Sequence, residues 1–160
     1  MADKSLTRKS ARELVAMIKA RAVSPVEVLD AHLAVIARVN PKLNAIVTLA
    51  AEQANGNARA VEAAVMRGER LGALAGLPVA IKDITPTAGI RTTFGSPLYK
   101  DYVPEEDAEA VSRLKAAGAI VLGKTNTPEF GSSSRTRFPA RSEPCRSRPP
   151  RPTRRRSQPG

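Results

Sequence analysis

In the first part of the chain, apolar residues recur every three or four positions after each of two polar motifs that are typical of helix starts. The motif SARE at 10–13 is a capping box, in which the Ser and Glu side chains can each bind the other residue's backbone N–H. A second box, SPVE at 24–27, has Pro25 at the first helical position. These patterns predict two helices. The second should stop at Asn40-Pro41, because proline interrupts helical hydrogen bonding.

The following stretch mixes strand and helix signals. The apolar run AIVTL at 45–49 predicts a strand, and the Ala-rich residues 50–67 favour a helix that Gly56 weakens in the middle. GLPVAIKD at 76–83 places a short apolar run between Gly-Leu-Pro and a charged end. This pattern is typical of a short, mostly buried strand.

A further helix and strand follow in the same part of the chain. DAEAVSRLKAAGA at 107–119 has acidic residues in its first turn, and Gly118 stands just past the predicted helix end. AIVLGK at 119–124 has the pattern of a buried strand. Because strand and helix alternate after residue 70, the sequence predicts an α/β fold with a βαβ-type unit.

The character of the chain changes abruptly after Ser134. Residues 135–160 contain no Val, Ile, Leu or Met and hold six of the 13 prolines. Such a segment cannot bury enough apolar surface to offset the entropy cost of ordering it. We therefore divide the chain into an ordered part, 1–134, and a C-terminal Arg/Pro-rich tail, 135–160, which is predicted to be disordered.

Most of the positive charge belongs to this tail. Residues 135–160 hold nine Arg and one acidic residue, Glu143, and so carry +8 of the formal net charge of +11. Arginine-rich segments bind nucleic acid non-specifically through counterion release. With Phe138 as its one aromatic residue, the tail offers little base stacking. A nucleic-acid-binding or interaction protein that acts through the basic tail remains an alternative function.

The composition argues against a disulfide-bonded, metal-binding, membrane-spanning or secreted protein. The single cysteine, Cys145, cannot form an internal disulfide, and one cysteine with one histidine, His32, does not make a metal-ligand set. The sequence contains no run of about 18 apolar residues, so it predicts no transmembrane helix. The N-terminus lacks the apolar stretch of a signal peptide. These observations favour a cytoplasmic protein without a bound metal.

Lys82, at the end of the strand predicted in GLPVAIKD, is the main candidate for chemistry. Lysine is rarely buried without a partner, so either its stem lies along the strand end with the ammonium in water, or it has a chemical role. The neighbouring Asp83 either orients the loop that follows or is a solvated turn residue. The serines at 132–134 have no companion base. His32 lies on a predicted helix and has no sequence context that would support a Ser-His-Asp arrangement.

Several separated motifs together carry a resemblance. GLPVAIKD is followed by GIRTTFGS at 89–96 and then by DAEAVSRLKAAGAIVLGKTNTPEFG at 107–131. With the helical opening segment at 10–49, these motifs resemble the amidase signature family over residues 1–134. TPTAG at 85–89 is more similar to stand-alone amidases than to the A subunit of tRNA-dependent amidotransferases. A fragment of such an A subunit is a further alternative for this chain.

The resemblance implies both a fold and a reaction. The fold would be the N-terminal part of a mixed sheet flanked by helices. The reaction would be hydrolysis of a small-molecule amide to a carboxylate and ammonia or an amine, without a cofactor. It would use a nucleophilic serine, a second serine in a cis peptide bond and a lysine. Lys82 matches that lysine. Burial would lower the pKa of its amine from about 10.4 and allow it to accept a proton.

The same comparison leaves the two serines unassigned. The family spacing puts the bridging serine roughly 75 residues after the lysine and the nucleophile about 25 residues further on. The first position falls near Ser157, which stands in RRRSQPG instead of a Gly/Ser-rich loop, and the second falls beyond residue 160. We therefore expect an inactive chain, and we interpret residues after 134 as translated out of frame.

Overall fold

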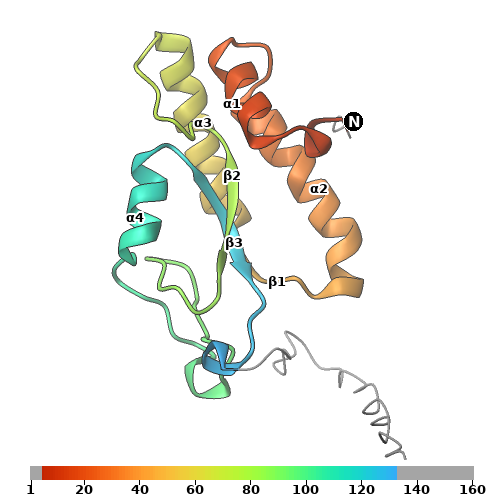
Figure 1. Cartoon of the computed structure of the whole chain (residues 1–160), viewed down its shortest axis with the longest axis vertical. Coiled ribbons are helices and arrows are strands. Elements are labelled where there is room, and N and C mark those ends of the chain that lie inside the picture. The colour runs from red at the N-terminus through yellow and green to blue at the C-terminus, as the bar shows by residue number, and fades with distance from the viewer. Residues whose placement is uncertain (1–4, 133–160) are drawn as a thin grey trace, which may run out of the picture.

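Three strands and four α-helices form the part of the chain that the computed structural model describes, residues 5–132 (Figure 1). In chain order they are α1 (Ala11–Lys19), α2 (Pro25–Leu43), β1 (Ile46–Leu49), α3 (Ala51–Arg67), β2 (Pro78–Lys82), α4 (Glu109–Ala116) and β3 (Ile120–Thr125). Short 3-10 turns lie at Leu6–Arg8, Pro97–Tyr99 and Glu129–Gly131. The predicted α/β class is confirmed. The expected disordered tail, 135–160, lies outside the described residues.

Both predicted capping boxes are present. At the start of α1, the Ser10 backbone N–H donates to the Glu13 carboxylate at 2.8 Å, and the Glu13 N–H donates to the Ser10 hydroxyl at 3.3 Å. The Ser10 hydroxyl and backbone N–H together lower the pKa of Glu13. At the start of α2, the Ser24 N–H donates to Glu27 at 2.8 Å. These bonds satisfy N–H groups that would otherwise lack partners at the helix starts.

Helix α2 does not stop where the sequence analysis placed its end. It runs through Pro41 to Leu43, and Asn44 then ends it in the left-handed conformation. Near the end of a helix, proline removes only one backbone hydrogen bond, so the last turn can continue past it. Asn40 stabilises this end because its side-chain amide both donates to and accepts from the backbone of Ile46, at 2.9 and 2.8 Å.

The sheet has the order β1-β3-β2 and is mixed. Strands β2 and β3 are parallel and are connected through α4, which confirms the predicted βαβ-type unit. Strand β1 pairs with β3 in the antiparallel direction. The central position of β3 explains why its residues Ile120–Lys124 are all buried.

Each face of β3 packs against different helices. Ile120 and Leu122 join a core cluster with residues of α2 and α3, whereas Val121 packs with Val111 of α4 and Ile81 of β2. The ribbon shows α4 on one side of the sheet and α2 on the other (Figure 1). This three-layer arrangement holds the ends of β2 and β3 side by side.

Strand β2 is more exposed than its apolar sequence suggested. Ile81 is the one buried residue of this strand, and Ala80 and Lys82 are exposed. The prediction of a mostly buried strand was therefore wrong for the described residues. The reason is topological: β2 lies at an edge of this sheet, where no further described strand covers it.

Candidate active site

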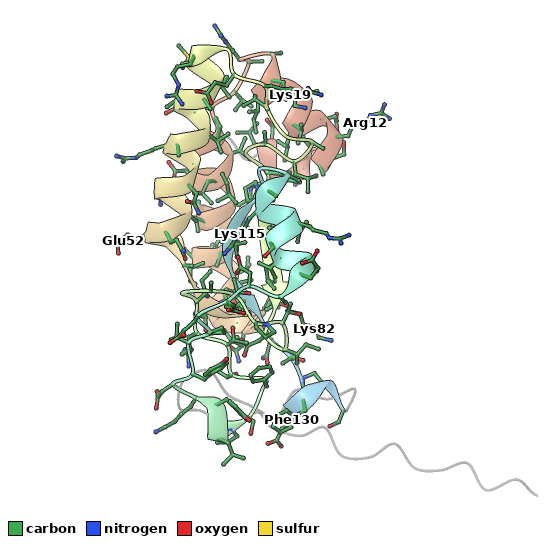
Figure 2. The ribbon with its side chains drawn as sticks, turned by 90° about the vertical axis from the view of Figure 1, so that its left-hand side faces the viewer. Arg12, Lys19, Glu52, Lys82, Lys115 and Phe130 are labelled. Carbon is green, nitrogen blue, oxygen red and sulfur yellow. The ribbon has the colours of Figure 1, made fainter. Side chains whose placement is uncertain are left out.

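Lys82 is the last residue of β2, and its side chain is exposed. It pairs with Thr125 of β3, and its carbonyl accepts a hydrogen bond from the Thr85 N–H at 2.9 Å. Figure 2 shows the side chain at the outside of the fold. A shallow hollow of about 270 Å³ beside Arg91 lies elsewhere and is not lined by Lys82. The structure thus fixes the backbone that carries the amine and leaves the amine itself accessible.

Asp83 orients the loop that follows Lys82. Only 1% of Asp83 is exposed, so it is not a solvated turn residue. Both of its carboxylate oxygens lie 3.2 Å from the Thr93 N–H, and the Thr93 hydroxyl also donates to this carboxylate. Its own N–H donates to the Thr125 carbonyl of β3 at 3.0 Å. These bonds join the two ends of the segment 83–93, and the first of the two sequence alternatives is confirmed.

The buried lysine of this region is Lys124, at the end of β3. It is 0% exposed, and its ammonium donates to three oxygens of the segment 83–93. Sequence reasoning missed this residue. The available signal was that AIVLGK, like GLPVAIKD, ends an apolar strand in a lysine. Because parallel strands end at the same edge of a sheet, the two lysines are neighbours in the fold.

A β-bulge decides which way Lys124 points. The register between β2 and β3 shifts after Val79, so Ala80 pairs with Gly123 and Ile81 pairs with Lys124. Residues paired in neighbouring strands point to the same face, and consecutive residues point to opposite faces. Lys124 therefore shares the α4 face with Ile81, whereas Lys82 points to the other face of the sheet.

Burial and nearby charges shift the pKa values of Lys124 and of its neighbour Asp107. Burial lowers the pKa of Lys124 from 10.5 to about 8, and the nearby carboxylates of Asp83 and Asp107 oppose this effect. Burial alone would raise the pKa of Asp107, but hydrogen bonds from Lys115 and from the Ala88 N–H lower it overall. The Lys115 ammonium lies 2.7 Å from the Asp107 carboxylate.

Four aromatic rings, here called the aromatic cluster, lie beyond this end of the sheet: Phe94, Tyr99, Tyr102 and Phe130. Neighbouring ring centroids are 5.0–6.4 Å apart. The cluster is connected to the loop after Lys82, because the Phe94 N–H donates to the Asp83 carbonyl at 3.0 Å and the Phe130 N–H donates to the Phe94 carbonyl at 2.8 Å. Backbone hydrogen bonds thus connect the aromatic cluster to the loop that follows Lys82.

The remaining sequence candidates do not form a second site in residues 5–132. A ring nitrogen of His32 lies 2.7 Å from the Val28 carbonyl within α2, and the exposed Ser132 hydroxyl donates to the Glu129 carbonyl at 2.8 Å. The described residues contain no group of three potential ligands close enough to hold a metal ion. No helix among them has the length and apolar character needed to cross a membrane. Three further candidates lie outside the described residues: Ser133, Ser134 and Ser157.

Comparisons with known proteins identify the family of this chain. A family profile described as Amidase matches residues 27–155, a range that extends past residue 134. The chain is 47% identical over 131 residues to the A subunit of the Glutamyl-tRNA(Gln) amidotransferase from Acidothermus cellulolyticus, covering 82% of this chain and 26% of the relative. The corresponding protein of Carboxydothermus hydrogenoformans is 47% identical over 136 residues, covering 82% of this chain and 28% of the relative.

Solved structures show the same fold. A bacterial aryl acylamidase of the amidase signature family is 32% identical with a TM-score of 0.76, covering 80% of this chain and 27% of that one. The native peptide amidase of Stenotrophomonas maltophilia is 33% identical with a TM-score of 0.71, covering 76% of this chain and 25% of that one. The chain spans about a quarter of the length of the curated relatives it matches. Profile, relatives and fold agree, and the chain belongs to the amidase signature family.

Proposed function

We propose that this chain supplies the lysine of an amide-hydrolysing site, with Lys82 as the base and two serines outside the described residues as nucleophile and bridging group. The reaction is amide plus water to carboxylate plus ammonia or amine. The observation that carries the proposal is the position of Lys82 at the carboxyl end of β2, on a backbone fixed through Thr85 and Asp83.

The chemistry requires a change in the surroundings of Lys82. A lysine acts as a base only in its neutral amine form, which burial favours. Further polypeptide packed over the exposed edge of β2 would desolvate the amine and lower its pKa, so that it could draw a proton from the nucleophile through the bridging serine. Without such packing and without an assigned nucleophile, we propose that the 160-residue chain alone does not hydrolyse amides.

The test moves residues 27–131 into two longer relatives. In the acylamidase hybrid they replace the matching segment of the bacterial aryl acylamidase, and amine release from a small amide is measured. In the amidotransferase hybrid they replace that segment in the Acidothermus cellulolyticus relative, and amidotransferase activity of the reconstituted enzyme is measured. In an active hybrid, we expect Lys82→Met to lower kcat at least about 10³-fold. Lys42→Met, at an exposed lysine of α2, should leave kcat unchanged.

The results separate the alternatives. Activity in the acylamidase hybrid alone favours a stand-alone amidase. Activity in the amidotransferase hybrid alone favours the A subunit of an amidotransferase, which is what the curated relatives are named. A folded hybrid that keeps its activity after Lys82→Met would show that Lys82 is not the base. Turnover of a small amide by the 160-residue chain itself would overturn the proposed inactivity.

A further inference from the structure

A second lysine, Lys124, is built into the same strand ends but is not used by the proposed chemistry. It is fully buried, and its side chain points to the opposite face of the sheet from Lys82. Burial of an ammonium is costly unless its donors find acceptors. The contacts of Lys124 therefore indicate what the fold gains from this position.

The ammonium binds three points of one segment. It donates to the Thr85 carbonyl, to the Thr87 hydroxyl at 3.1 Å and to the Thr92 hydroxyl at 2.8 Å. A lysine ammonium has three donors, so all of them are used. The two hydroxyls in turn donate to carbonyls of the same segment, Thr87 to Thr85 and Thr92 to Ile90, at 3.1 and 3.0 Å. The result is a closed polar network in which every member has a partner.

This network borders directly on Lys82. Thr85, whose carbonyl accepts from Lys124, donates its own N–H to the Lys82 carbonyl at 2.9 Å. At the other end of the segment, Thr93 binds the Asp83 carboxylate. The segment 83–93 is thus bound to the end of β2 through Thr85 and to Lys124 at points near both of its ends.

We propose that Lys124 is a positioning residue for Lys82: by binding Thr85, Thr87 and Thr92, its ammonium holds the segment 83–93 in one conformation and so fixes the backbone from which Lys82 projects. This inference rests on the proposed function of Lys82. Packing of the lysine stem alone would not require the three oxygen acceptors. Substitutions that keep volume and remove only polar groups therefore separate the two roles.

The test compares Lys124→Met, Thr92→Val and the double variant in the full 160-residue chain by amide hydrogen exchange monitored with NMR. Each substitution approximates the volume of the original side chain and removes the ammonium or the hydroxyl. We expect exchange at the Thr85 and Phe94 amides to increase about tenfold in Lys124→Met, with α2 unchanged. The double variant should be no faster than Lys124→Met, because both changes break the same network. Lys42→Met, which removes an exposed ammonium of α2 that has no contact with the segment 83–93, is the control.

Unchanged exchange in segment 83–93, or an equal increase throughout the protein, would overturn the proposal. So would additive effects of Lys124→Met and Thr92→Val, because they would show two independent packing defects. If Lys124→Met does not fold, Thr87→Val and Thr92→Val, which retain the lysine, make the same comparison.

The hybrid enzymes separate this inference from the proposed function. In an active hybrid, Lys124→Met should lower kcat about tenfold and leave KM unchanged, because positioning acts on the reacting group. An unchanged kcat, where Lys82→Met abolishes activity, would overturn the positioning role. If instead Lys82→Met has no effect, the proposed function fails, while the exchange experiment still decides whether Lys124 holds the segment.

Discussion

At the scale of single residues, the loop after β2 depends on buried polar groups. Asp83 and Thr93 form one pair of contacts in this loop, and Lys124 with the hydroxyls of Thr87 and Thr92 forms another. In the low-dielectric interior, removing one partner leaves the other buried without a hydrogen bond. This lowers the stability of the fold by more than the bond had contributed.

Asp83→Asn tests the first pair. The amide group keeps one oxygen acceptor but directs an NH₂ donor toward the Thr93 N–H, so we expect the free energy of unfolding to fall by about 1–3 kcal/mol. Asp101→Asn, at an exposed carboxylate, should change it by less than about 0.5 kcal/mol. Urea unfolding measures both variants. Equal stability of the two would show that the Asp83 contacts contribute nothing.

The lowered pKa of Lys124 predicts how stability depends on pH. Between its folded value of about 8 and its ordinary value of 10.5, the unfolded chain binds the proton that the folded protein has released. The contribution of Lys124 to stability therefore rises with pH across this range, and this gain is lost as the pH falls to 8. Urea unfolding of the wild type and Lys124→Met at pH 7 to 10.5 should show the wild type gaining relative to the variant. A constant difference would contradict the lowered pKa.

At the scale of elements, Gly123 allows the β-bulge that directs Lys124. A Cβ atom at this position would lie 2.3 Å from the Thr48 carbonyl oxygen of β1 and 3.2 Å from the Leu49 Cα. Strand β1 approaches β3 closely here, so no side chain fits without a shift of the backbone. The close pairing of β1 with β3, directly before Lys124, therefore depends on this glycine.

Gly123→Ala should destabilise the fold by about 1–3 kcal/mol and broaden NMR signals of β1. Gly56→Ala is the matched control, since Gly56 is an exposed residue of α3 and an added methyl group there would have no atom within 4 Å. Because glycine inside a helix costs roughly 0.5–1 kcal/mol relative to alanine, this control should stabilise the protein. Thermal unfolding distinguishes the two, and a Gly123→Ala protein as stable as the wild type would contradict the close approach.

At the scale of the whole molecule, apolar surface is concentrated at one end. Leu98 is 85% exposed and Phe130 is 54% exposed, and the two short turns that carry them lie side by side (Figure 1). Tyr99, Tyr102 and Val103 add further exposed apolar area. Contiguous exposed apolar surface of this kind promotes association, as does the exposed edge of β2.

We expect the 160-residue chain to self-associate as its concentration rises, in sedimentation velocity. Leu98→Asp should reduce this association because it places a charge on the apolar surface, without lowering the unfolding temperature. Leu43→Asp, at an exposed leucine at the end of α2, is the control and should reduce it less. A wild-type chain that stays monomeric at every protein concentration tested would show that this surface does not drive association.

The sequence by itself determined the local elements and the family. The capping boxes of α1 and α2, the βαβ unit and the motif around Lys82 were all readable, because each depends on residues close together in the chain. The preference for a stand-alone amidase, the catalytic role of Lys82 and the out-of-frame tail stay predictions. The end of α2 was misplaced because proline is tolerated in a last turn.

Only the tertiary structure decided how the two strand-end lysines differ. Both lysines end apolar runs, and the pattern of apolar residues does not distinguish them. The sheet order places β2 at an edge and β3 in the centre, and the bulge at Gly123 turns Lys124 toward the segment 83–93. Burial depends on neighbours that are distant in sequence, so a one-dimensional pattern cannot specify it. That long-range pairing leaves the Lys82 side chain exposed and makes Lys124 part of the interior.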